Sequence, residues 1–311
     1  MTEEVVLVLG YPASGKTTFA KEQFPTHTRL NRDELGGSLS KLAGMLGAKI
    51  KSGIKSFVLD NTFPDRVSRA PFIKAAREGG LPIRCYWLTT SLEDSQYNVA
   101  QRMIRKYGKL LDAQEAKKTK DDNCVPSIAL YAYRKAFETP TTEEGFDSVE
   151  RVTFQRKYAP EYKNRALILD YDGTLRLTKS GSNYPKSPDD IIIQANRKEV
   201  LTKYKDQGYI LAGVSNQSGI AGGELTRDQA SSCFQKTNDL LGLEIDFNFC
   251  PHKAFPLECC CRKPASGSGV LLIERYKLNP AECIMVGDMT TDKNFATRCG
   301  FQYIPADKFF K

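Results

Sequence analysis

Residues 5–20 read VVLVLGYPASGKTTFA and decide the fold of the N-terminal half of the chain. The apolar run Val5–Leu9 has the length and composition of a buried strand. A glycine-rich turn follows and leads through Lys16 and Thr17 into a helical pattern, which is the context that a Walker A motif requires. Backbone N–H groups of such a turn and of the helix N-terminus surround phosphate groups. The stretch therefore predicts a nucleoside triphosphate site after a parallel strand.

The motif also predicts individual roles. Lys16 is expected to neutralise the charge of the β- and γ-phosphates of ATP, and the hydroxyl of Thr17 is expected to hold Mg²⁺. The phosphate-binding residues predicted in this turn are Gly10, Ser14, Gly15, Lys16, Thr17 and Thr18.

Short apolar runs alternate with helical patterns through both halves of the 311-residue chain. The predicted strands are Val5–Leu9, Phe57–Leu59, Cys85–Leu88, Ala166–Leu169, Ile210–Val214 and Cys283–Val286. Strands separated by helices form βαβ units, so the fold class is α/β with parallel sheets and ligands at the carboxyl ends of the strands. The length suits two domains. The charged stretch Asp147–Lys163 separates them, and we place the domains at 1–155 and 156–311.

Composition narrows the functional classes. The formal charge of +8 suits either a polyanionic partner or simple solubility. Nine cysteines without a secretion signal argue against a disulfide framework. No apolar stretch approaches the roughly 20 residues that a membrane span needs. We therefore expect an intracellular protein, cytoplasmic or nuclear, without a membrane partner.

Acidic residues follow two further strands of the first half. Asp33, after Leu30, can accept the proton of an attacking hydroxyl in phosphoryl transfer, or it can cap the helix that begins near Leu35. Asp60 ends the strand at Phe57–Leu59, and it can orient Mg²⁺ through water or cap the next helix.

These segments resemble the kinase domain of animal polynucleotide kinase/phosphatases over about residues 5–150. The resemblance includes Asn31–Gly36, Asp60–Asp65 and Tyr133–Glu138. It implies an ATP-dependent kinase of nucleic acid 5′-hydroxyl ends, in which Asp33 activates the hydroxyl and Arg32, Asp60 and Asn61 support the acceptor side.

A basic stretch between Arg102 and Lys120 is expected to form a lid over the triphosphate site. Such a run is often only a solvated helical face. Alternatively, Arg102 and Arg105, which lie three residues apart and share a helix face, bind the transferring phosphoryl group as an arginine finger does.

The second half contains a carboxylate pair at the end of a strand. Asp170 and Asp172 follow Ala166–Leu169, and Gly173 and Thr174 follow the pair. One carboxylate of such a pair can attack phosphorus and form an aspartyl phosphate, while the other protonates the leaving oxygen and later activates water. The alternative is an ordinary Asp-Gly turn after a strand.

Three later segments favour the catalytic interpretation. Ser215 and Asn216 end a strand with groups suited to phosphate, Lys263 can hold the phosphoryl group, and Asp288 and Asp292 supply further acidic side chains. The ordered set resembles the haloacid dehalogenase superfamily of phosphatases, over about residues 165–305. This implies a Rossmann-like domain without a large cap, with Asp170 as nucleophile and Asp172 as acid/base. It also implies Mg²⁺ held by Asp170, Asp172, Asp288 and Asp292.

Four residues of a cysteine-rich segment have the spacing of a structural Zn²⁺ site. They are Cys250, His252, Cys259 and Cys261. The alternative is a set of unligated thiols in a reducing cell. The segment resembles the zinc loop of heptose-bisphosphate and histidinol-phosphate phosphatases, whereas the segment after Thr178 resembles the flap of polynucleotide phosphatases.

Together these features predict a bifunctional enzyme that phosphorylates 5′-hydroxyl ends and removes 3′-phosphates from broken DNA or RNA, leaving ends that a ligase joins. The first alternative is a small-molecule kinase joined to a sugar-phosphate or histidinol-phosphate phosphatase. The second is an end-binding scaffold without catalysis, which the presence of Lys16, Asp33, Asp170 and Asp172 argues against.

Overall fold

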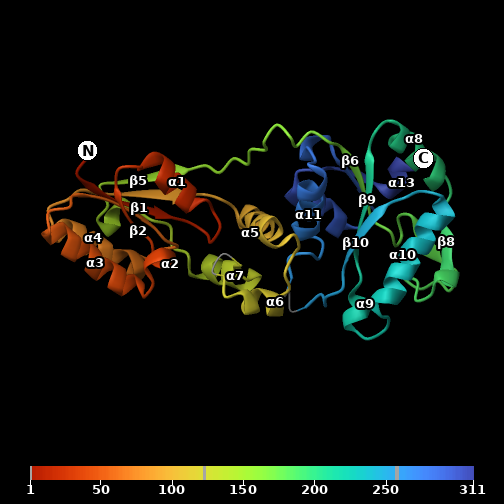
Figure 1. Cartoon of the computed structure of the whole chain (residues 1–311), viewed down its shortest axis with the longest axis horizontal. Helices are drawn as coiled ribbons and strands as arrows, with labels where there is room; N and C mark the ends of the chain where they lie inside the picture. Colours follow the sequence, from red (N-terminus) through yellow and green to blue (C-terminus); the bar gives the residue numbers. More distant parts are fainter. Residues whose placement is uncertain (1, 122–123, 256–258) are drawn as a thin grey trace. The chain divides into compact units, whose positions relative to one another are not determined.

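The computed structural model of the chain (Figure 1) describes residues 2–121, 124–255 and 259–311. It separates into two compact units. One unit comprises Met1–Asn98 and Ile128–Arg156, and the other comprises Val99–Ser127 and Lys157–Lys311. The expected domain limits, 1–155 and 156–311, remain a prediction. The second stretch of the first unit ends at Arg156, whereas the segment Val99–Ser127 groups with the second unit.

The first unit contains a five-stranded parallel sheet in the order β2-β3-β1-β4-β5. Its strands are β1 (Glu4–Leu9), β2 (Thr28–Leu30), β3 (Ser56–Asp60), β4 (Ile83–Leu88) and β5 (Ser148–Val152). The helices around it are α1 (Lys16–Gln23), α2 (Arg32–Leu35), α3 (Leu39–Lys51), α4 (Arg66–Glu78) and α7 (Ser127–Ala136). Helices α5 (Leu92–Tyr107) and α6 (Ala113–Thr119) precede α7.

Side chains of the central strand β1 alternate between two apolar cores. Val5, Leu7 and Leu9 pack with residues of α3 and α4, while Val6 and Val8 pack with residues of α1. All five side chains are buried, as expected for a parallel strand covered by helices on both faces. Packing against helices on both faces holds β1 in place, and the glycine-rich turn begins at the carboxyl end of this strand.

The second unit contains a five-stranded parallel sheet in the order β10-β9-β6-β11-β12. Its strands are β6 (Ala166–Leu169), β9 (Ile210–Asn216), β10 (Asp246–Cys250), β11 (Ile284–Gly287) and β12 (Gln302–Pro305). Its helices are α8 (Arg197–Asp206), α9 (Ser218–Ala221), α10 (Arg227–Leu241), α11 (Gly267–Tyr276), α12 (Thr290–Cys299) and α13 (Ala306–Phe309).

A short antiparallel hairpin, β7 (Arg176–Thr178) with β8 (Ile191–Ile193), stands apart from this sheet. It follows the turn after β6 and packs against α10. The core beneath the sheet joins Leu167 and Leu169 of β6 to apolar residues of α8, α10 and α13. The hairpin therefore occupies the position expected for a small flap beside the carboxylate pair.

The structure confirms parallel α/β sheets in both halves. Within the described residues, no helix combines the length and apolar character that crossing a lipid bilayer requires.

Candidate active sites

The glycine-rich turn after β1 adopts the conformation that its sequence predicts. Gly15, directly before α1, has a φ of 95°, in the region that favours glycine. A Cβ on Gly10 would lie only 2.9 Å from the carbonyl oxygen of Leu88, so this position also excludes side chains. Lys16 Nζ donates to the carbonyl oxygens of Gly10 at 3.0 Å and of Tyr11 at 2.6 Å. The ammonium group is thus held over the turn where phosphates would bind.

Asp60 is the centre of a polar network beside this turn. The Thr17 hydroxyl donates to Asp60 Oδ2 at 2.7 Å. Arg29 donates from Nε and Nη2 to the two oxygens of the same carboxylate, each at 2.8 Å. Asp60 is buried and does not cap the next helix, because Asp65 occupies the N-cap of α4. A carboxylate beside the Thr17 hydroxyl is a donor set that suits Mg²⁺.

The acceptor residues cluster next to Asp60. Asn31 caps α2 by accepting from the backbone N–H of Asp33 at 2.8 Å, and its amide donates to the carbonyl oxygen of Asp60 at 2.7 Å. Asn61 Oδ1 accepts from the backbone N–H of Arg32 at 3.0 Å. The alternative role of Asp33 as a helix cap is wrong, since Asn31 caps α2 and Ser38 caps α3, the helix that follows Leu35. The Asp33 carboxylate stays exposed, 3.5 Å from the Arg32 guanidinium.

The remaining predicted phosphate ligands take no part in this network of hydrogen bonds. Ser14 is buried within the turn, and Thr18 is exposed on α1. Arg102 and Arg105 are exposed on the part of α5 that groups with the second unit. Arg105 donates to Glu274 at 3.2 Å. Among the residues that the structure describes, neither arginine forms a hydrogen bond or ion pair with the turn, and their role in binding ATP remains a prediction.

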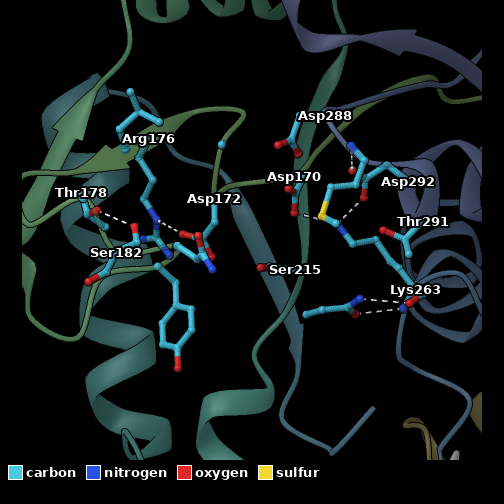
Figure 2. A pocket seen from close by; sticks show the side chains of 17 residues that line it. Asp170, Asp172, Arg176, Thr178, Ser182, Ser215, Lys263, Asp288, Thr291 and Asp292 are labelled. Atoms are coloured by element: carbon cyan, nitrogen blue, oxygen red, sulfur yellow. Dashed lines mark hydrogen bonds and ion pairs between the residues drawn. The ribbon is translucent and has the colours of Figure 1, made fainter. Parts of the chain in front are cut away.

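Lys263 is the centre of the second candidate site (Figure 2). Its Nζ lies 2.7 Å from Asp170 Oδ1, 2.7 Å from Asp292 Oδ1 and 2.7 Å from the carbonyl oxygen of Val214. Its side chain is 3% exposed, which fixes the ammonium group at the carboxyl ends of β6, β9 and β11. Burial lowers the pKa of Lys263, but the charges of Asp170 and Asp292 outweigh burial and hold the pKa above its ordinary value.

Three carboxylates gather around this lysine. Oxygens of Asp170, Asp288 and Asp292 all lie within 4.8 Å of one another. Burial raises the pKa of Asp170, Lys263 opposes this effect, and Asp292 adds to it. Burial also raises the pKa of Asp288. The three carboxylates carry more negative charge than the one ammonium group of Lys263 can neutralise. Their oxygens are ligands of the kind that Mg²⁺ prefers.

Glycine is required where these carboxylates approach the backbone. Gly173 has a φ of 81°, and a Cβ there would lie 2.4 Å from Asp288 Oδ2. The turn after Asp172 therefore permits Asp288 to reach the site.

Asp172 belongs to the same cavity but not to the three-carboxylate group. Its Oδ1 accepts from Arg176 Nε at 2.8 Å, and its Oδ2 accepts from Gln217 Nε2 at 2.7 Å. Figure 2 shows Asp172 next to Arg176 and the flap, whereas Asp170 lies next to Lys263 and Asp292. The structure thus separates the environments of the two carboxylates, and it does not bring the Asp172 side chain into the group expected to hold Mg²⁺.

The phosphate-binding residues predicted at the end of β9, Ser215 and Asn216, line the same cavity. Ser215 Oγ accepts from Gln217 Nε2 at 3.0 Å. Asn216 is paired with the backbone of Lys263, because Oδ1 accepts from Lys263 N at 2.9 Å and Nδ2 donates to Lys263 O at 3.0 Å. The cavity has a volume of about 630 Å³ and extends to flap residues Ser182 and Tyr184. It is large enough to contain a phosphorylated sugar.

The four predicted zinc ligands come together in the second unit. Donor atoms of Cys250, His252, Cys259 and Cys261 all lie within 4.8 Å of one another. His252 Nδ1 is 3.5 Å from Cys250 Sγ and 3.4 Å from Cys261 Sγ. A compact set of three thiols and one imidazole fits a closed tetrahedral Zn²⁺ site.

Sequence reasoning missed the partners of two acidic residues. Arg29 faces Asp60 from a neighbouring strand, and Arg176 reaches back across a turn to Asp172. Arg176 lies four residues after Asp172 in the sequence. This spacing indicates a side-chain contact in a helix but not in a turn, so it did not predict the contact.

Comparisons with known proteins agree with both halves of this description. A family described as polynucleotide kinase 3 phosphatase matches residues 165–310, and an AAA domain matches residues 38–138. A bifunctional polynucleotide phosphatase/kinase of Schizosaccharomyces pombe is 36% identical over 155 residues, which cover 49% of this chain and 34% of the relative. The chain thus spans about a third of that relative's length.

Two further proteins are similar to part of the chain. A D-glycero-beta-D-manno-heptose-1,7-bisphosphate 7-phosphatase of Haemophilus influenzae is 33% identical, over 42% of this chain and 73% of the relative. The solved structure of a D,D-heptose 1,7-bisphosphate phosphatase from B. bronchiseptica is 25% identical, with a TM-score of 0.40, over 45% of this chain and 78% of that chain.

The strand-end carboxylates, the buried lysine and the matches in sequence agree on one classification. The chain belongs to the haloacid dehalogenase superfamily of phosphatases, with a phosphatase domain of the polynucleotide kinase 3 phosphatase family after a P-loop kinase domain.

Proposed function

We propose that this chain is a bifunctional enzyme that heals nucleic acid ends, by phosphorylating 5′-hydroxyl ends and hydrolysing 3′-phosphate ends. The observation that supports the proposal is the presence of two separate groups of polar side chains suited to phosphate, one around Lys16 and Asp60 and the other around Asp170 and Lys263. The named relative from Schizosaccharomyces pombe supports the choice of polynucleotide substrates. The products would be the 5′-phosphate and 3′-hydroxyl ends that a ligase requires in strand-break repair.

In the kinase reaction, the turn N–H groups and Lys16 would bind the phosphates of ATP. Asp33 would accept the proton of the 5′-hydroxyl as its oxygen attacks the γ-phosphorus and the bond to ADP breaks. Mg²⁺ would neutralise phosphate charge, and Thr17 with Asp60 would hold it. Exposure of Asp33 supports its role, because the end of a polymer must reach the general base.

In the phosphatase reaction, Asp170 would attack phosphorus while Asp172 gives a proton to the leaving oxygen. Asp172 would then take a proton from water as that water attacks the aspartyl phosphate, which restores Asp170 and releases phosphate. Lys263 and Ser215 would bind the phosphoryl oxygens. Asp170, Asp288 and Asp292 would hold Mg²⁺, which neutralises charge on the phosphoryl group when bound.

The zinc cluster would stabilise the loop that carries Lys263. Cys259 and Cys261 lie two to four residues before Lys263 in the chain, so a bound Zn²⁺ would restrain that segment.

A second candidate is hydrolysis of a small sugar phosphate or histidinol phosphate, with a small-molecule kinase in the first half. The named relative from Haemophilus influenzae and the compact cysteine–histidine cluster favour this candidate. The site around Asp170 would perform the same chemistry on either substrate.

Four oligonucleotides test the proposal: DNA and RNA strands, each with a 5′-hydroxyl or a 3′-phosphate, incubated with ATP and Mg²⁺. We expect transfer of labelled phosphate to 5′-hydroxyl ends and release of phosphate from 3′-ends. Asp33→Ala should remove only the first activity, and Asp170→Asn only the second. Turnover of heptose bisphosphate or histidinol phosphate, with all four oligonucleotides unchanged, would favour the second candidate.

A further inference from the structure

Arg176 is a buried cation that the predicted chemistry does not use. Its side chain is 1% exposed, and its guanidinium lies 4.6 Å from the ring centre of Phe234. Nη1 donates to the carbonyl oxygen of Cys233 at 2.7 Å and to Thr237 Oγ1 at 2.9 Å, both on α10. Nε donates to Asp172 Oδ1 at 2.8 Å. A buried charge is stable only when it is paired, and Asp172 is the carboxylate that pairs with it.

The Asp172 carboxylate is consequently held at both oxygens. Arg176 binds Oδ1, and Gln217 binds Oδ2 while also donating to Ser215 Oγ. A carboxylate oxygen has two lone pairs, so each oxygen keeps one that these donors do not occupy. Figure 2 shows the resulting arrangement, in which Arg176 approaches Asp172 from the flap and Lys263 lies across the cavity.

We propose that Arg176 is a positioning residue of the phosphatase reaction, which fixes Asp172 so that an unoccupied lone pair faces the leaving oxygen of the substrate. The inference rests on the proposed function of Asp170 as nucleophile and Asp172 as acid/base. As the bond between phosphorus and the leaving oxygen breaks, the proton passes from Asp172 to that oxygen. In the second half of the reaction the same oxygen of Asp172 receives a proton from water.

The consequence is a dependence on the leaving group. A sugar hydroxyl, as in a nucleotide 3′-phosphate, leaves poorly without a proton, and general acid catalysis typically contributes about 10²–10⁴-fold. Dinitrophenolate is a stable anion and needs no proton. A defect in the position of Asp172 should therefore slow phosphoryl transfer to Asp170 from the first substrate and spare this step with the second, whereas general damage to the cavity should slow the step with both.

The experiment compares kcat/KM of the full chain on an oligonucleotide 3′-phosphate and on 2,4-dinitrophenyl phosphate. This ratio reports the steps up to departure of the leaving group and excludes the later hydrolysis of the aspartyl phosphate, in which Asp172 acts for both substrates. For Arg176→Met we expect a loss of about 100-fold on the oligonucleotide and less than about 3-fold on the aryl phosphate. Asp172→Asn should show the same selectivity. Adding Arg176→Met to Asp172→Asn should cost less than about 2-fold more, because a residue that acts through Asp172 has nothing left to position. Equal losses on both substrates, or additive losses in the double variant, would overturn the inference.

Thr237→Val is the matched control, since it removes a contact of Arg176 on α10 and leaves the contact with Asp172. We expect both activities to stay within about 3-fold of the parent. A selective loss as large as that of Arg176→Met would assign the effect to packing of the flap on α10 and contradict the proposal.

Arg176→Lys decides the outcome if the methionine variant does not fold. Lysine keeps the positive charge but lacks the planar guanidinium. A smaller loss of activity confined to the oligonucleotide would support the proposal, and an equal loss of activity on both substrates would contradict it. Failure of the proposed function is separately visible, because the parent chain would then leave the oligonucleotide intact. The same leaving-group comparison would in that case use a sugar phosphate.

Discussion

A buried ion pair joins two segments of the first unit. Arg69 on α4 donates from Nε and Nη2 to Glu144 at 2.7 and 2.8 Å, and from Nη1 to the carbonyl oxygens of Phe63 and Glu138. The side chains of Arg69 and Glu144 are 0% and 4% exposed. This one residue therefore connects α4 to the segment before β5.

Replacing Arg69 by methionine should destabilise the first unit by about 3–5 kcal/mol, because Glu144 would become a buried charge without its partner. Urea unfolding followed by fluorescence measures this change. Trp87, the one tryptophan of the chain, lies on β4 and reports on the first unit.

Lys74→Met is the control for that prediction. Lys74 and Glu78 form an exposed pair at 3.8 Å on the same helix, where ion pairs contribute about 0.3–0.5 kcal/mol. Equal effects of the two substitutions would show that burial of the Arg69–Glu144 pair has no special importance.

At the scale of elements, the position of a strand in its sheet decides whether sequence predicts it. The central strands β1, β6, β9 and β11 are covered on both faces and appear as apolar runs. The strands missed in the two main sheets, β5, β10 and β12, are all edge strands. They alternate or mix polar and apolar residues, as SVERV in β5 does, and such short patterns resemble loops.

The candidate sites follow the same division. Residues at the ends of central strands, such as Asp170 and Ser215, were predictable because parallel strands present their carboxyl ends at one edge. Arg29 and Arg176 were not, because their contacts depend on side-chain direction between strands or across a turn. The number of residues that separates Arg29 from Asp60, or Arg176 from Asp172, does not determine the direction of the side chains.

The short helix α2 carries Asp33, the proposed general base of the kinase reaction. Asn31→Ala removes the cap of α2 and the bond to the Asp60 carbonyl oxygen. We expect a loss of about 1–2 kcal/mol in stability and a kinase rate lowered by about 10-fold or more, because Asp33 loses its fixed position. Assays of both activities should show an unchanged phosphatase.

Ser38→Ala provides the comparison, since Ser38 caps α3 by accepting from the backbone N–H of Lys41. It should cost about 1 kcal/mol and leave the kinase rate unchanged. If both alanine variants slowed the kinase equally, general loss of stability would explain the effect and positioning of Asp33 would not.

The cysteine–histidine loop should behave as a metal-dependent element. Cys259→Ala is expected to abolish binding of about one Zn²⁺ per chain, to lower the melting temperature of the second unit, and to reduce phosphatase activity, because Lys263 follows in the same loop. Metal analysis and calorimetry measure the first two effects. Cys260→Ala, next to it but outside the cluster, should retain the metal. A parent protein that is free of metal and stably folded would disprove this assignment.

At the scale of the whole molecule, each candidate site is built from residues of one compact unit. The network around Asp60 uses the first unit, and the one around Lys263 uses the second. A mixture of Asp33→Ala and Asp170→Asn chains should therefore restore both activities on a nicked duplex with a 3′-phosphate and a 5′-hydroxyl. Sealing by added ligase is the measurement, and a mixture that seals no better than either variant would contradict the independence of the sites.

From the net charge of +8 we derive a prediction that distinguishes a nucleic acid substrate from a small sugar phosphate. A chain that contacts about three phosphates of a single strand should lose affinity with a log–log salt slope of about −2, because bound cations are released. Raising NaCl from 50 to 200 mM should then lower kcat/KM for an oligonucleotide 3′-phosphate by about 10- to 20-fold. The value for 2,4-dinitrophenyl phosphate, which lacks neighbouring phosphates, should change by less than about 2-fold. Parallel, shallow responses of both substrates would mean that the positive charge serves solubility, and they would favour the small-molecule candidate for the second unit.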